Sequence, residues 1–241
     1  GCPPTAKQTM QNVLDGVPVD QTGLPPYFPF PGGSFANGGA MRISPLAVAY
    51  RNANAASLRS AVAAAILASH RHPEAVDFAV VQAAAVQYAL RGHPADFDSE
   101  ALLADLAARC ETDGMRRVIL ATSAALKDAP DSCDEQAAVR KIVDLENRPG
   151  SGMGFQIASV HMAPCVLWPV CRHSQDPRNA VQLAIDLGGD TDTTACMVGA
   201  IVGALHGESW CGPWAEGLEN GPHGRDFALG LAEQLSRLDV R

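Results

Sequence analysis

Gly188-Gly189-Asp190-Thr191-Asp192-Thr193-Thr194 is the segment that best indicates how this chain folds and what it binds. It precedes a run of small apolar residues from Ala195 to Leu205. Paired glycines permit backbone conformations that other residues avoid. The spacing predicts that Asp190 lies at or near a helix N-cap and that Asp192 and Thr193 lie in the first turn. The helix dipole favours negative charge there by roughly 0.3–1 kcal/mol.

Two interpretations of this helix start remain open. Two carboxylates this close repel each other unless a cation lies between them, and carboxylate and hydroxyl oxygens are the ligands that Mg²⁺, Mn²⁺ and Ca²⁺ prefer. Asp190, Asp192 and Thr193 are therefore candidate metal ligands, and the absence of an adjoining His or Cys makes zinc less suitable. In the other interpretation Asp190 caps the helix, Asp192 interacts with the dipole and Thr193 bonds back to the chain.

A stripe of small residues follows at helical spacing, formed by Gly199, Ala200, Gly203 and Ala204. We expect this face to be buried closely among other helices. A buried helix start that carries two acids would then need a counter-charge, which favours the metal interpretation. Close helix packing alone also explains small residues.

Composition predicts a single all-α domain over residues 1–241. The chain is 47% hydrophobic and 5% aromatic, and its β-branched residues form no alternating runs. The net charge of −8 argues against direct nucleic-acid binding. The longest apolar run is too short for a bilayer, no signal peptide opens the chain, and the seven cysteines include no CxxC pair. We therefore expect a soluble, intracellular and cytoplasmic protein with reduced thiols and no membrane contact.

Helix start and stop signals predict a series of helices. Ser44 as N-cap with Pro45 after it begins one, and Ser132 with Glu135 forms a capping-box pattern for another. Much of residues 1–40 has the Pro- and Gly-rich composition of a loop. The predicted helices cover about residues 4–14, 44–52, 56–70, 73–90, 99–110, 115–126, 132 onward, 155–171, 177–188, 190–206 and 226–238.

Gly33-Ser34-Phe35-Ala36-Asn37-Gly38-Gly39-Ala40-Met41-Arg42 is the second distinctive segment. Its glycines expose backbone N–H groups that can form a nest for an anion such as a phosphate. Phe35 offers a stacking face, and Asn37 offers both a donor and an acceptor. A tight loop that leads into the helix at Ser44, with Arg42 solvated, explains the same residues equally well.

Together the two segments resemble the ADP-ribosylglycohydrolase family, which includes the dinitrogenase-reductase-activating glycohydrolases and the eukaryotic ADP-ribose-acceptor hydrolases. The motif L-G-G-D-T-D-T followed by G-A-I-V-G-A carries the resemblance. The run from Gly33 to Arg42 is most similar to the branch that removes ADP-ribose from serine and breaks poly-ADP-ribose. Ser69-His70-Arg71-His72-Pro73 resembles the T-H-x-H-P segment, with Ser69 in place of Thr, and Gly152-Met153-Gly154-Phe155 resembles the G-x-G-aromatic loop.

The resemblance covers nearly the whole chain and implies an orthogonally packed, all-helical fold with two Mg²⁺ or Mn²⁺ ions. In that family Asp190, Asp192 and Thr193 would be ligands of these ions. For His70 a satisfied, partly buried side chain is as good an interpretation as contact with the phosphates. The residues that the resemblance assigns to substrate binding are Gly33, Ser34, Phe35, Asn37, His70, Gly154 and Phe155, with Phe155 beside the adenine.

The early part of the family's pattern is absent from this sequence. The family has a G-D-x-x-G helix with a catalytic acid and a T-D-D-T segment with the remaining metal ligands. Here the acids before residue 74 are Asp15 and Asp20, and neither has those neighbours. We therefore expect an N-terminally truncated relative that lacks the family's first helices, a fragment, or a protein completed by an N-terminal segment or another chain. No catalytic residue is nominated.

Two functions follow from the resemblance. The first is Mg²⁺-dependent hydrolysis of the glycosidic bond of ADP-ribose on modified protein side chains, or of poly-ADP-ribose. The second is a non-catalytic relative that binds ADP-ribose or is structural, as lens crystallins similar to this family are. In either case the expected partner is ADP-ribose or an ADP-ribosylated protein.

Overall fold

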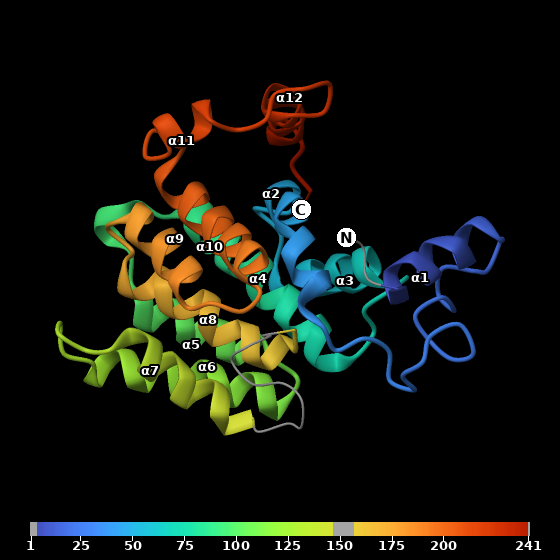
Figure 1. Cartoon of the computed structure of the whole chain (residues 1–241), viewed down its shortest axis with the longest axis horizontal. Coiled ribbons are helices and arrows are strands. Elements are labelled where there is room, and N and C mark those ends of the chain that lie inside the picture. The colour runs from blue at the N-terminus through green and yellow to red at the C-terminus, as the bar shows by residue number, and fades with distance from the viewer. Residues whose placement is uncertain (1–3, 147–156, 241) are drawn as a thin grey trace.

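The computed structural model describes residues 4–146 and 157–240, and within these ranges every regular element is a helix (Figure 1). The prediction of an all-α fold is confirmed. Extended backbone pairing in the described ranges is limited to an isolated antiparallel bridge between Ala36 and Ala158. The elements are α1 Pro4–Leu14, η1 Asn37–Arg42, α2 Ser44–Ala49, α3 Ala55–Ile66, α4 Pro73–Arg91, η2 Pro94–Asp96, α5 Ser99–Arg109, α6 Asp113–Asp128, α7 Glu135–Val143, η3 Asp144–Glu146, α8 Ser159–Arg172, α9 Pro177–Asp186, α10 Thr191–His206, α11 Pro213–Glu216 and α12 Arg225–Ser236.

Helix α4 forms the centre of the molecule because it is apolar on nearly every side. It contacts α2, α3, α5, α8 and α10, and Phe78 and Val81 are fully buried among them. A polar side chain within it is also satisfied, since Gln82 Nε2 donates to the carbonyl of Met197 at 3.1 Å. This bond connects α10, which carries the candidate acids, to the middle of the core.

Helix α8 is buried along almost its whole length, although it contains Pro164 and Pro169. Its Trp168 donates from Nε1 to Glu135 Oε2 at 2.8 Å. The predicted capping box at the start of α7 is therefore wrong. Asp134, immediately before the helix, accepts the N–H of Ala137 at 3.0 Å and leaves Glu135 to pair with α8.

Two predicted helix starts are displaced. Ser44 was expected at the N-cap, but it is the first helical residue, because Ile43 before it already has α-region dihedrals. The helix predicted from residue 155 begins at Ser159, and residues 155–156 lie outside the described ranges. The lengths and order of the remaining helices agree with the sequence pattern to within a few residues.

Helix α10 begins at a turn that requires glycine. Gly188 and Gly189 have φ values of +75° and +74°, in the left-handed region that favours glycine. The expectation that the small-residue stripe of α10 is closely buried holds only in part, because Ala200 and Ala204 pack partly buried against the core but the two glycines have open space beside them. A Cβ placed on Gly199 or on Gly203 would meet no described atom within 4 Å, because α4, α8 and α9 contact other faces of the helix.

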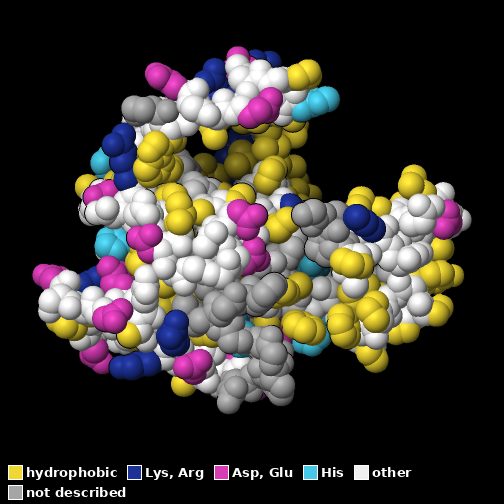
Figure 2. All heavy atoms as spheres, viewed as in Figure 1, with side chains coloured by type: hydrophobic (Ala, Val, Ile, Leu, Met, Phe, Trp, Pro, Cys, Tyr) yellow, Lys and Arg dark blue, Asp and Glu magenta, His cyan; other side chains and the backbone are white. Residues whose placement is uncertain are grey.

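The C-terminal segment with α11 and α12 stands away from the body, and Figure 2 shows a hollow between the two. Contacts with α2 hold its end, where Val240 N–H donates to the carbonyl of Ala49 at 2.9 Å and Asn52 Nδ2 to Asp239 Oδ1 at 2.9 Å. Helix α12 buries none of its side chains. Among the described residues no helix combines the length and the hydropathy that a bilayer crossing needs.

Candidate functional site

The two segments that the sequence singles out meet in space. Asn37 Nδ2, at the start of η1, donates a 2.7 Å hydrogen bond to Asp190 Oδ2 at the start of α10. Asn37 is only 6% exposed, so its side chain has few alternative directions. The contact joins positions 153 residues apart and defines a candidate site between η1 and the N-terminus of α10.

Backbone pairing with the residues before α8 fixes the loop that carries Asn37. Asn37 N–H donates to the carbonyl of Ile157 at 2.9 Å, and Ser159 N–H donates to the carbonyl of Phe35 at 3.0 Å. The Ser159 hydroxyl adds a 3.1 Å bond to the carbonyl of Ala36. These bonds hold the Asn37 amide toward α10. These bonds cannot be predicted from a side-chain pattern in the sequence, because their acceptors and most of their donors are backbone groups.

Asp190 occupies the N-cap position of α10, but its side chain makes no capping hydrogen bond. Its carboxylate instead accepts from Asn37, so the capping interpretation is wrong for this residue. Asp192 is exposed, and its Oδ1 accepts the N–H of Thr193 at 2.8 Å. That N–H, and secondarily the Asp190 carboxyl group, hold the pKa of Asp192 below its ordinary value.

Asp190, Asp192 and Thr193 suit a hard cation by ligand type but not by number. Mg²⁺ takes six oxygen ligands, several of them water, and Ca²⁺ takes six to eight. These residues offer two carboxylates and a hydroxyl, and Thr193 Oγ1 lies 3.9 Å from Met41 Sδ. In the part of the chain that the structure describes, no group of three His, Cys, Asp or Glu side chains is placed to hold a metal. A cation at this position would therefore need ligands beyond these three residues.

His70 lies against the same loop. A Cβ on Gly38 would fall 2.9 Å from His70 Nε2, so the glycine is required by this close approach. His70 Nδ1 is 2.8 Å from Ser69 Oγ, and Arg42 Nη2 is 2.6 Å from the same oxygen. The guanidinium can only donate, so the Ser69 oxygen accepts from Arg42 and its hydroxyl can donate to Nδ1; in that tautomer the imidazole proton is on Nε2.

This arrangement keeps His70 neutral. Burial first, and the nearby Arg42 charge second, lower the pKa of His70 to about 4. A neutral imidazole with its proton on Nε2 is a hydrogen-bond donor to an anion or a hydroxyl at the loop. Arg42 also donates to the carbonyl of Gly38 at 2.8 Å, and its side chain is still exposed, as the interpretation of a solvated Arg42 expects.

The other predicted substrate-binding residues have structural partners here. Gly33 has a φ of +79°, and a Cβ there would lie 2.9 Å from the Cβ of Arg71. Ser34 Oγ accepts the N–H of Ala36 at 3.3 Å, which tightens the turn. The ring of Phe35 is edge-on to His72, with centroids 6.1 Å apart. Gly154 and Phe155 lie outside the described residues.

The sequence predicted Asn37, His70 and Asp190 as site residues. It did not predict the hydrogen bonds that connect Arg42 to Ser69 and Ser69 to His70. A signal existed, since Ser69 supplies a hydroxyl at the position where the similar family segment has a threonine. The role of the Ile157 carbonyl had no signal in the sequence.

A sequence profile of the family described as ADP-ribosylglycohydrolase matches residues 1–241. The chain is 28% identical over 212 residues to the uncharacterized protein YegU of Escherichia coli K12, covering 85% of this chain and 58% of the relative. It is 31% identical over 200 residues to ADP-ribosylhydrolase ARH3 of Danio rerio, and the match covers 73% of this chain and 50% of the relative. It is also 31% identical over 202 residues to ARH3 of Homo sapiens, and that match covers 74% of this chain and 53% of the relative.

The chain thus spans between 50% and 58% of the length of these relatives. A solved structure titled "ADP-ribosylglycohydrolase-related protein complex" superposes on it with a TM-score of 0.66 at 24% identity. The match covers 99% of this chain and 70% of that chain. At this identity the likeness concerns the fold.

Proposed function

The chain belongs to the ADP-ribosylglycohydrolase family, and on that premise we propose that it hydrolyses the glycosidic bond of ADP-ribose on a modified protein side chain or in poly-ADP-ribose. The observation that supports this most is the 2.7 Å contact between Asn37 and Asp190. It places the loop proposed to bind ADP-ribose directly beside the acids proposed to bind Mg²⁺.

In this proposal the diphosphate and ribose of ADP-ribose lie against the loop of Gly33, Ser34, Phe35 and Asn37. His70 donates from Nε2 to an oxygen of the diphosphate, which its neutral state and its position beside Gly38 permit. Arg42 supplies positive charge behind it. Gly154 and Phe155 are assigned to the adenine end by the resemblance alone.

Mg²⁺, or Mn²⁺ in its place, is proposed to bind Asp190, Asp192 and Thr193. A bound divalent ion would orient an oxygen of the substrate and stabilise charge on it. The Asp190 carboxylate accepts from Asn37 through Oδ2 and makes no capping bond to its own helix, and we propose that it faces the ion. The remaining ligands and the catalytic acid are not assigned to residues of this chain.

A second candidate is binding of ADP-ribose without hydrolysis. It is favoured by one observation, that the described residues place no third acid beside Asp190 and Asp192. The two candidates differ in a single readout, the release of ADP-ribose from a serine-ADP-ribosylated peptide in the presence of Mg²⁺. Binding without release would support the second.

The test is calorimetric titration of ADP-ribose, with and without Mg²⁺, into the wild-type chain and two Asn→Ala variants. Asn37→Ala should weaken binding about tenfold or more, since it removes a hydrogen bond to a charged group at the site. The control is Asn12→Ala, because Asn12 is also 6% exposed and donates at 3.3 Å to a backbone carbonyl, that of Tyr27. The loop would have only a structural role if both variants bound ADP-ribose with equal affinity. The same would follow if Asn37→Ala lost far more stability than Asn12→Ala.

A further inference from the structure

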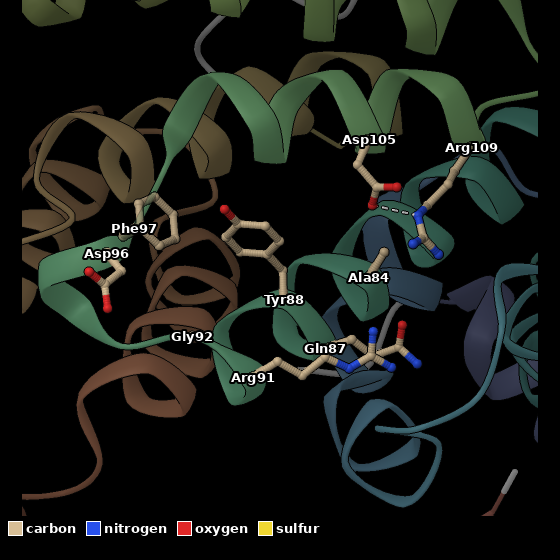
Figure 3. A pocket seen from close by; sticks show the side chains of 9 residues that line it. All are labelled: Ala84, Gln87, Tyr88, Arg91, Gly92, Asp96, Phe97, Asp105 and Arg109. Atoms are coloured by element: carbon tan, nitrogen blue, oxygen red, sulfur yellow. Dashed lines mark hydrogen bonds and ion pairs between the residues drawn. The ribbon is translucent and has the colours of Figure 1, made fainter.

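A separate pocket of about 340 Å³ lies at the C-terminal end of α4, between that helix, η2 and α5 (Figure 3). Gly92 on its edge abuts the side chain of Leu205, near the end of α10. Leu205 follows Asp190 by 15 residues, so at 1.5 Å per residue the pocket is about 22 Å from the candidate site. A ligand in this pocket would therefore not touch Asn37 or Asp190.

Arg109 lines this pocket together with its ion-pair partner Asp105. Its Nε donates to Asp105 Oδ2 at 2.7 Å, but its Nη1 is buried and has no acceptor among the described residues. A buried donor without an acceptor costs about 1–3 kcal/mol, and more when the group is charged. The guanidinium thus keeps one buried N–H group without an acceptor in the described part of the chain.

Arg91 adds a second cation to the same side of the pocket. Its Nε donates to the carbonyl of Arg51 at 2.9 Å, and its Nη2 donates to the same carbonyl. Its positive charge therefore meets a neutral carbonyl rather than a carboxylate. Figure 3 shows the guanidinium groups of Arg91 and Arg109 on one side of the pocket, with Asp105 beside Arg109, and Phe97 with the exposed Asp96 on the other.

Aromatic rings form the apolar part of the pocket. Tyr88 and Phe97 are edge-on, with centroids 5.7 Å apart, and the Tyr88 hydroxyl donates to the carbonyl of Asp98 at 3.2 Å. That bond holds the Tyr88 ring between the arginines and Phe97. Ring faces suit a flat apolar body, and Asp96 at the far side disfavours a second negative group there.

We propose that this pocket binds a small flat organic carboxylate, with its carboxylate on Arg109 and Arg91 and its apolar body against Tyr88 and Phe97. The volume is within the range of small-molecule sites, and the two arginines give geometric preference for a planar anion. The site is independent of the proposed hydrolase activity, because it shares no residue with the loop or with the acids of α10.

The test titrates the ¹⁵N-labelled chain with benzoate and with benzamide, a neutral molecule of the same shape. Benzoate should shift amide signals of residues 84–97 and 105–109, and benzamide should not. Arg109→Gln and Arg91→Gln should each weaken benzoate binding about tenfold or more, as loss of a charge-assisted hydrogen bond implies. The matched control is Arg237→Gln, since Arg237 also pairs with an acid one turn earlier, Glu233, at 2.8 Å.

Three results would overturn the proposal: equal binding of benzamide, wild-type affinity in both arginine variants, or no shifts up to the solubility limit of benzoate. The last result would mean that water alone satisfies Arg109. If Arg109→Gln fails to fold, Arg91→Gln tests the proposal instead, because Arg91 is exposed and its substitution should leave the fold intact.

Discussion

The amide of Asn37 and the carboxylate of Asp190 are held 2.7 Å apart, although the N-cap position of Asp190 offers it the N–H groups of its own helix. An aspartate at such a position ordinarily accepts one of them. Asp176 does so at the start of α9, where it accepts the N–H of Asn179 at 3.1 Å. The two acids therefore differ in role, and substitution separates them.

Asp190→Asn combined with Asp192→Asn should abolish Mg²⁺-dependent ADP-ribose binding and leave stability close to that of wild type. The asparagine at 190 keeps an acceptor for Asn37, and the side chain of Asp192 is exposed. Calorimetry for binding and urea unfolding for stability give the two readouts. Mg²⁺-dependent affinity equal to that of wild type would refute the metal assignment.

Asp176→Ala is the control and should behave in the opposite way. It removes a real cap, which costs about 1 kcal/mol of stability, and lies outside the candidate site. ADP-ribose binding should be unchanged.

Gly38→Ala should weaken ADP-ribose binding through His70. The added methyl would lie 2.9 Å from Nε2 and 3.0 Å from Cε1 of the imidazole, so the ring must shift from the loop. Because the clash is with the end of a side chain, we expect a loss of affinity larger than the loss of stability. The measurement is calorimetry alongside thermal unfolding. Unchanged affinity would show that His70 does not contact the ligand.

Gly199→Ala, the same chemical change on an open helix face, should raise the free energy of unfolding by about 0.5–1 kcal/mol. Glycine in a helix interior is destabilising relative to alanine, and no described atom lies within 4 Å of the new Cβ. Urea unfolding of this variant and of Gly203→Ala measures the effect. A loss of stability in both would mean that this face is covered in solution.

The fold was largely predictable because its signals are local. Caps, prolines, glycines and apolar periodicity mark most helices, and the paired glycines at 188 and 189 indicated the turn in which the structure gives both a positive φ. Long-range polar contacts were not predictable. Asp77 is fully buried in α4, pairs with Arg59, and accepts the N–H of Thr112 at 2.7 Å at the start of α6. When a carboxylate on one helix caps a different helix, the two residues have no fixed separation in the sequence, so no local pattern reveals the contact.

The candidate site was predictable in part for the same reason. The residue types of Asn37 and of Asp190 indicate their chemistry, but their contact depends on backbone bonds from the loop to Ile157 and Ser159. The burial expected for Gly199 and Gly203 failed because a stripe of small residues permits close packing without causing it. Only the arrangement of neighbouring helices decides whether such a face is covered.

His70 should make the chain less stable in mild acid. Its folded-state pKa of about 4 lies below the ordinary value of 6.5, so between these two values the unfolded chain binds more protons than the folded chain. The stabilising contribution is therefore complete above about pH 6.5 and is lost as the pH falls toward 4. A shift of this size corresponds to at most about 3 kcal/mol.

In His70→Gln this part of the pH dependence should disappear. Unfolding free energies of the variant and of the wild type, measured from pH 7 to pH 4.5, should therefore converge as the pH falls. The His70 Cε1 proton of the wild type, followed by NMR, should still report a neutral ring at pH 5. Titration of that proton near pH 6.5 instead would mean that the ring is solvated, and the contacts of His70 with Ser69 and Gly38 would then not persist in solution.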